Sequence, residues 1–244
     1  MIHSVTLRLW PAILAMPMAV QAGNIVDCPV QSDQPPIIQA QAAVSGGLEL
    51  YPSLAAFEEV VGEELAHESF DQGAVSEPGD GIGDCVEPLS AISDDQCYSP
   101  GDLIEGFSLT STSGGGYVVL GDNHHQVGQE GLAVGPMQII SSEFSNIATI
   151  VSFSADDVTA VAMDVIPGCN GLDVNVWVFD RQDSLIGSTT ISVDASWHSG
   201  FLGFVTPAPV GRVELATSPS GGQLIQNLRF GPHLDWLFHD RFEP

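Results

Sequence analysis

A run of alternating residue types in the C-terminal half constrains the fold of this chain most. From residue 172 to 179, Leu or Val at every second position alternates with Asp, Asn, Trp or Phe. A period of two fits a β-strand and not a helix. A polar turn follows at 180–183, and extended runs bounded by turn-forming residues lie at 184–193, 201–205, 212–217 and 223–230. The stretch 172–230 therefore predicts five short strands of an antiparallel sheet.

The residues before this stretch predict further strands and one helix. Ser53 stands at an N-cap position ahead of Leu54, Phe57, Val60 and Val61, whose spacing indicates a short amphipathic helix. The other predicted strands lie at 37–44, 47–51, 65–70, 103–111, 116–121, 132–140, 147–153 and 158–166. Of these segments about ten to twelve are counted as strands, and together with one helix they predict an all-β fold. We expect a two-sheet antiparallel β-sandwich, jelly-roll-like, with one short N-terminal helix.

The N-terminus has the pattern of a secretion signal. His3 and Arg8 precede an apolar run at 9–20, and small residues lead up to Ala22. The expected organisation is a signal peptide at 1–22, an extended leader at 23–46, the β-sandwich domain at 47–231 and a C-terminal tail at 232–244. No later apolar stretch is long enough to span a bilayer, so no membrane span is expected in the mature chain.

The charge of the chain is strongly negative. There are 31 Asp and Glu residues against 5 Lys and Arg, and the formal net charge is −26. Such a surface repels phosphate backbones, which argues against nucleic acid and anionic membranes as partners. Two explanations fit the excess of acidic residues. One is solubility in an extracellular medium, and the other is that divalent cations neutralise some of the carboxylates.

Four cysteines in an exported chain predict two disulfides, for which three connectivities are possible. We favour Cys85–Cys97, because the segment between them is loop-like and a bridge would tie it down. Cys28–Cys169 is then the remaining pair. None of the four has the spacing of a zinc site.

Residues 71–102 form a long segment rich in Gly, Pro and acids, and such loops are uncommon unless they are functional, cross-linked or metal-bound. Calcium prefers several oxygen ligands, so it is the cofactor that this segment indicates. The candidate ligands are Asp71, Glu77, Asp80, Asp84, Asp94 and Asp95. The segment lacks a complete Asp-x-Asp-x-Asp-Gly loop, and a solvated acidic loop is the alternative.

One face of the strand predicted at 172–179 carries a candidate binding site. Asp173, Asn175 and Trp177 would project from the same side, where an aromatic ring can stack on a sugar and polar neighbours can bind its hydroxyls. Other aromatic or ring-bearing residues considered for the same platform are Tyr117, Phe179, Trp197 and His198. The alternative is that Trp177 and Phe179 fill the edge of the core.

Several short motifs occur in a familiar order. They are Tyr-x-Ser-x-x-x-Phe at 51–57, Glu-Ser-Phe-Asp at 68–71, Phe-Ser-x-x-x-Val-Thr-Ala-Val at 153–161 and Leu-Arg-Phe-Gly at 228–231. This order resembles secreted bacterial β-sandwich proteins of the exosortase-sorted (PEP C-terminal) type. Many of those proteins end in a Pro-Glu-Pro motif, a membrane helix and a basic cluster. Residues 235–244 instead resemble short Ile-Phe-x-Asp-Gly-Phe-Glu tails of exported proteins, with Arg241 where Gly is usual.

These observations predict a secreted, non-catalytic β-sandwich protein, located outside the cell, in the periplasm or on the surface of a bacterium, with an extracellular glycan as the expected partner. A structural protein of the matrix or envelope is one alternative. A glycosidase-type or other hydrolase is another, but the sequence has no Gly-x-Ser-x-Gly or His-Glu-x-x-His motif. A carboxylate pair for glycoside hydrolysis can be recognised only from its geometry.

Overall fold

The computed structural model describes residues 45–62, 64–74, 82–112, 117–120, 133–136, 148–167, 173–193, 199–217 and 223–233. They form one helix, α1 (Leu54–Val61), and the strands β1 (Ser45–Gly46), β2 (Glu49–Tyr51), β3 (Ala66–Glu68), β4 (Ile82–Cys85), β5 (Leu89–Ser90), β6 (Phe107–Ser111), β7 (Tyr117–Leu120), β8 (Ala133–Pro136), β9 (Thr149–Phe153), β10 (Ala160–Pro167), β11 (Asp173–Asp180), β12 (Leu185–Ser192), β13 (Gly200–Val205), β14 (Val210–Thr217) and β15 (Gln223–Gly231). Within the described part of the chain, α1 is too short to cross a membrane, and no other helix is present.

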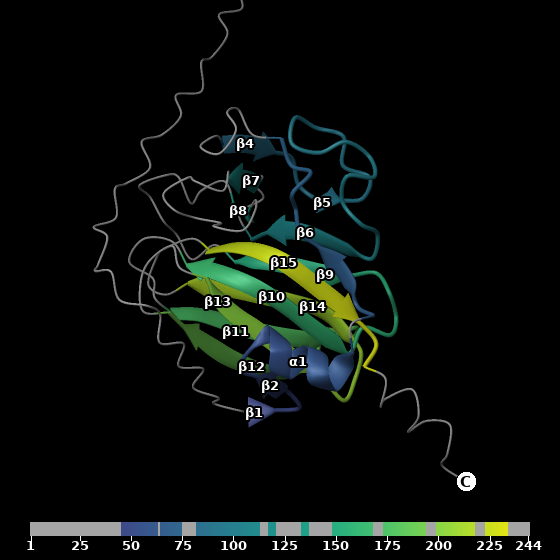
Figure 1. Ribbon diagram of the computed structural model, residues 1–244, viewed down its shortest axis with the longest axis vertical. Helices are drawn as coiled ribbons and strands as arrows, with labels where there is room; N and C mark the ends of the chain where they lie inside the picture. Colours follow the sequence, from purple (N-terminus) through teal and green to yellow (C-terminus); the bar gives the residue numbers. More distant parts are fainter. Residues whose placement is uncertain are drawn as a thin grey trace, which may run out of the picture.

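The strands form two antiparallel sheets that pack face to face (Figure 1). The seven-stranded sheet has the order β1-β12-β11-β14-β9-β6-β5. The eight-stranded sheet has the order β2-β13-β10-β15-β8-β7-β4, and β3 also pairs with β15. The prediction of a two-sheet antiparallel β-sandwich with one short helix is therefore confirmed.

The strands from β8 to β15 have jelly-roll topology. The strands β12, β11, β14 and β9 lie side by side in one sheet, and β13, β10, β15 and β8 lie side by side in the other. Every connection from β8 to β15 passes from one sheet to the other, except the β11–β12 hairpin. This alternation is the pattern of two Greek keys folded over one core.

The core lies between the sheets and is built by the period-two pattern. Val174, Val176 and Val178 of β11 are fully buried, while the residues between them are exposed or half-buried. Val161, Met163 and Val165 of β10 meet them in the same apolar cluster. Burial of one such side chain stabilises the fold by roughly 1.5–3 kcal/mol.

Helix α1 covers the outer surface of the eight-stranded sheet (Figure 1). The hydroxyl of Ser53 accepts a hydrogen bond from Ala56 N at 3.2 Å, which confirms the predicted N-cap. Phe57 and Val61 are buried against Ala160 and Ala162 of β10. For this reason β10 is buried on both of its faces, whereas β11 is buried on only one.

A row of aromatic rings joins the segment after β3 to strands β6 and β15. Phe70 contacts Phe107 with ring centroids 6.0 Å apart, and Phe107 contacts Phe230 at 5.9 Å. Gly106 precedes β6 with a φ of 107°, and a Cβ there would lie 2.8 Å from the Phe230 ring. The expected strand at 103–111 therefore begins only at Phe107, after this close approach.

Two other sequence-based expectations need correction. The five strands predicted at 172–230 do not form one sheet, because β13 and β15 belong to the eight-stranded sheet and β11, β12 and β14 to the other. The pattern of a strand identifies its buried face and not its neighbours. Within 71–102, expected to be irregular, the short strands β4 and β5 extend the two sheets. The strand expected at 37–44 lies outside the described residues.

Candidate functional site

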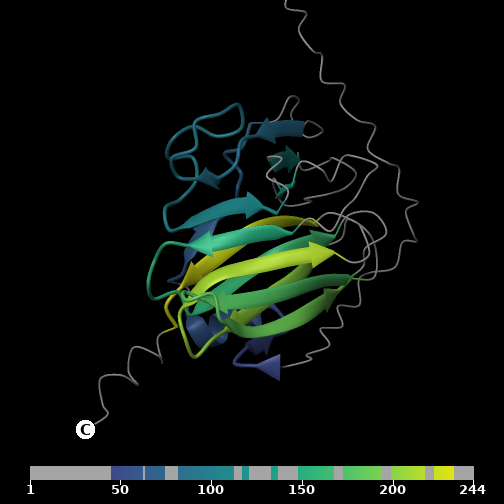
Figure 2. The ribbon, with the colours of Figure 1, turned by 180° about the vertical axis from the view of Figure 1, so that it is seen from behind.

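Strand β11 places the three predicted binding residues on the outer surface of the seven-stranded sheet. Asp173 is exposed, and Asn175 and Trp177 are half-buried, so all three point away from the core. In Figure 2, where the green and yellow-green strands face the viewer, no helix of the described residues crosses this surface. The interpretation of Trp177 as a core residue is therefore wrong.

The neighbouring strands surround Trp177 with polar side chains. In the antiparallel register Trp177 lies between Ser188 of β12 and Glu214 of β14. Similarly, Asn175 lies beside Thr190, and Asp173 beside Ser192. We call this surface the outer face, and its residues are Asp173, Asn175, Trp177, Phe179, Ser188, Thr190, Ser192, Arg212, Glu214, Ile150, Ser152, Ser108 and Thr110.

Two hydrogen-bonded pairs hold polar groups of the outer face in place. Thr190 Oγ1 donates to Asn175 Oδ1 at 3.0 Å, and Ser192 Oγ donates to Asp173 Oδ1 at 2.5 Å. Each pair joins β11 to β12 across the sheet. The side chains therefore lose less conformational entropy when a ligand binds than unpaired side chains would.

Arg212 lies at the end of the outer face next to the β11–β12 turn and interacts with three neighbours. Its Nε donates to Glu214 Oε1 at 2.8 Å, and its Nη1 donates to Asp183 Oδ1 in the β11–β12 turn. Its guanidinium carbon lies 3.9 Å from the centroid of the Phe179 ring, a cation–π contact. One face of the Phe179 ring is thus covered, and Trp177 is the better stacking surface.

The larger aromatic platform considered from the sequence does not assemble within the described residues. Phe179 is half-buried beneath Arg212, and Tyr117 belongs to β7 of the opposite sheet. Trp197 and His198 lie outside the described residues. The platform on the outer face therefore depends on Trp177 and its polar neighbours.

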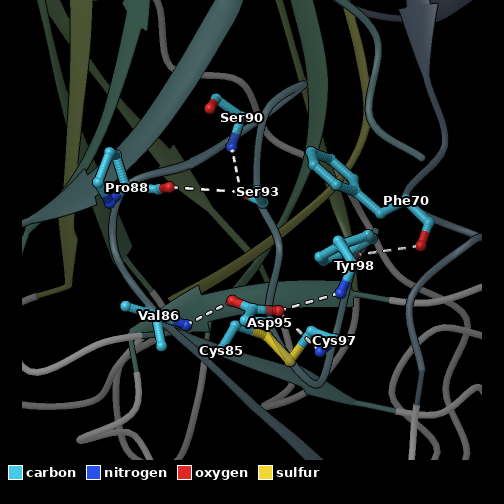
Figure 3. The surroundings of a disulfide bond; sticks show 9 residues. All are labelled: Phe70, Cys85, Val86, Pro88, Ser90, Ser93, Asp95, Cys97 and Tyr98. Atoms are coloured by element: carbon cyan, nitrogen blue, oxygen red, sulfur yellow. Dashed lines mark hydrogen bonds between the residues drawn. A yellow bond between two sulfur atoms is a disulfide. The ribbon is translucent and has the colours of Figure 1, made fainter. Parts of the chain in front are cut away.

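The predicted disulfide between Cys85 and Cys97 is confirmed. Their Cα atoms are 5.4 Å apart, and the bridge joins the end of β4 to the loop after β5 (Figure 3). The other predicted pair, Cys28–Cys169, lies outside the described residues.

Asp95 organises the same loop through its carboxylate, which accepts three backbone hydrogen bonds (Figure 3). Val86 N donates to Oδ2 at 2.7 Å, and Cys97 N and Tyr98 N donate to Oδ1 at 2.7 and 3.0 Å. Both carboxylate oxygens of Asp95 therefore already accept backbone hydrogen bonds, and these bonds hold the loop beside the disulfide.

The other predicted calcium ligands are only partly described. Asp71 lies in the turn after Phe70, Asp84 in β4, and Asp94 on an exposed part of the loop. Glu77 and Asp80 lie outside the described residues. No group of three or more His, Cys, Asp or Glu residues suited to a metal ion occurs in the described ranges. Calcium binding at 71–102 stays a prediction.

The sequence analysis missed the role of Glu68, a buried carboxylate. Its side chain accepts hydrogen bonds from Phe70 N at 2.6 Å and from Ile104 N at 2.9 Å. The neighbouring Tyr98 donates from its hydroxyl to Phe70 O at 3.3 Å. Burial, together with the nearby charge of Glu68, raises the pKa of Tyr98 above its ordinary value. In the sequence, only the two-residue spacing from Glu68 to Phe70 indicated the local one of these two hydrogen bonds.

No family model matches the sequence, and no curated protein matches it. Solved structures that match include variants of CBM29-2, studied for ligand recognition by family 29 carbohydrate-binding modules. One is 13% identical, with a TM-score of 0.32 over 68% of this chain and 91% of that one. Another, complexed with cellulohexaose, is 15% identical, with a TM-score of 0.33 over 70% and 95%. Similarity this weak carries no argument about function.

Proposed function

We propose that this chain is a secreted bacterial glycan-binding protein without catalytic activity, and that the glycan binds on the outer face. The observation that carries the proposal is the position of Trp177, half-buried in the middle of this face, in register between Ser188 and Glu214. An aromatic ring presents a flat apolar surface to the C–H groups of a sugar, and polar neighbours bind its hydroxyls.

The surroundings of Trp177 support this function better than a purely structural one. A residue that serves only the core points inward, as the flanking Val176 and Val178 do. Trp177 instead leaves a large apolar ring partly exposed among hydroxyl, amide and carboxylate groups. An aromatic anchor with a polar surround is the usual composition of a binding site.

Affinity electrophoresis against a panel of polysaccharides tests the proposal. We expect at least one polysaccharide to retard the exported protein, and Trp177→Ala to weaken binding by at least about tenfold, or about 1.4 kcal/mol. Trp177→Phe should retain part of the affinity, because a smaller ring still stacks. Ile92→Ala is the matched control, since Ile92 is an exposed apolar residue (84%) on the loop beyond β5.

Two results would contradict the proposal. One is that no polysaccharide retards the protein. The other is that Trp177→Ala, with an unchanged melting temperature, binds as tightly as the parent chain does. The structural alternative would then be preferred.

A further inference from the structure

We infer that the ligand of the outer face is a neutral glycan, and that acidic polysaccharides are excluded from it. This inference rests on the proposed function. Its basis is that the cationic side chains described around the outer face are few and already form ion pairs.

Each cationic side chain described near the outer face is engaged by acceptors of the protein. Arg212 pairs with Glu214 and Asp183. Arg181, at the β11–β12 turn, lies 2.9 Å from Asp156 and donates to the carbonyl of Ala155 at 2.7 Å. The chain contains no Lys at all. A carboxylate or sulfate group of a ligand would therefore have to displace an internal ion pair.

The charges on the outer face also favour a neutral ligand over an acidic one. Asp173 and Glu214 lie on the outer face and Asp183 adjoins it, whereas Arg212 is the one cationic side chain among the residues named for this face. The chain as a whole carries a net charge of −26. An acidic polymer is therefore repelled both at long range and in contact, and the described Arg side chains around the face already form ion pairs within the protein.

The hydrogen-bonding groups of the face fit neutral hydroxyls. The hydroxyl protons of Thr190 and Ser192 are donated within the protein, to Asn175 and Asp173. The Arg212 Nε bond occupies Oε1 of Glu214, which leaves Oε2 as an acceptor. The face thus offers carboxylate acceptors together with the amide donor of Asn175. Sugar hydroxyls both donate and accept, so they match this set, whereas an anionic group only accepts.

Binding measured at two ionic strengths tests the inference. The exported chain is titrated with neutral polysaccharides (a glucan, a mannan and a xylan) and with alginate and polygalacturonate as acidic probes. Salt is varied from about 0.01 to 1 M, over which the Debye length falls from about 30 to 3 Å. We expect Trp177-dependent binding to at least one neutral polysaccharide, changed by less than about twofold by salt, because no charges on the ligand are screened.

Glu214→Gln is the diagnostic variant and Glu59→Gln its matched control. Both remove one negative charge, but Glu59 is exposed on α1, on the opposite sheet. Glu214→Gln should weaken neutral binding by about three- to tenfold, because it replaces a charged acceptor, whereas Glu59→Gln should not change it.

The outcomes distinguish a failure of this inference from a failure of the proposed function. Trp177-dependent binding of an acidic polysaccharide, at either salt concentration, overturns the inference and leaves glycan binding intact. Equal effects of Glu214→Gln and Glu59→Gln would also overturn it. If no neutral or acidic polysaccharide binds, the proposed function itself fails, and the inference with it.

Discussion

Removal of the buried Glu68 carboxylate should destabilise the sandwich measurably. The two oxygens of Glu68 accept hydrogen bonds from the backbone N–H groups of Phe70 and Ile104. In Glu68→Ala both donors lose their partner, and an unsatisfied buried donor costs about 1–3 kcal/mol. Phe70 is fully buried, whereas Ile104 is half-buried and accessible to water. We therefore expect a total loss of about 2–4 kcal/mol in the free energy of unfolding.

Urea unfolding followed by tryptophan fluorescence measures this loss. For a domain of this size the melting temperature should fall by about 4–16 °C. Glu68→Gln should lose less, roughly 1–2 kcal/mol, because one acceptor oxygen remains. The slope of the unfolding free energy with urea should stay constant if only stability changes.

Glu105→Ala is the control for the loss of charge. Glu105 is exposed and adjacent to Ile104, and its removal relieves the same repulsion within an acidic chain. If Glu68→Ala is no less stable than Glu105→Ala, the two backbone hydrogen bonds do not have the role assigned to them.

Three further predictions concern the loops. Replacing both Cys85 and Cys97 with Ser should cost up to about 3 kcal/mol of stability, measured by urea unfolding; non-reducing peptide maps that show two free thiols would refute the bridge. Calcium at about 1 mM should raise the melting temperature by about 3–6 °C, more than magnesium does. Changing Asp80 and Asp84 to Asn should abolish the difference, and its survival would place the ion elsewhere. Two Gly residues inserted into the turn at 180–183 should cost about 1 kcal/mol or less, because closure entropy grows only logarithmically; insoluble protein would contradict that.

The sequence revealed those features that depend on neighbours along the chain. The alternation around Trp177 identified β11 and its outward positions, and Ser53 identified the start of α1. The turn at 180–183 was also recognisable from its composition, and in the structure Asp180 accepts hydrogen bonds from Gln182 N and Ser184 N. In each case the physical cause is local, so a short window of residues contains it.

The features that the sequence did not reveal depend on contacts between distant segments. Ser188 and Glu214 flank Trp177 only because β12 and β14 are its neighbours in the sheet, and strand order leaves no trace in a period-two pattern. The bond from Ile104 N to Glu68 joins residues that are far apart in the chain. Similarly, nothing in the composition of β14 showed that Arg212 would cover a face of Phe179.

The alternation in β11 has a consequence for how such a protein can change over time. The inward Val residues build the core, and the outward Asn175 and Trp177 do not belong to the core cluster between the sheets. Mutations can therefore accumulate at outward positions of β11, β12 and β14 without loss of the scaffold, so the proposed binding surface can change while the fold is kept. For the same reason, a library randomised at Asn175, Trp177, Ser188, Thr190 and Glu214 offers a route to new binding specificities on an unchanged jelly roll.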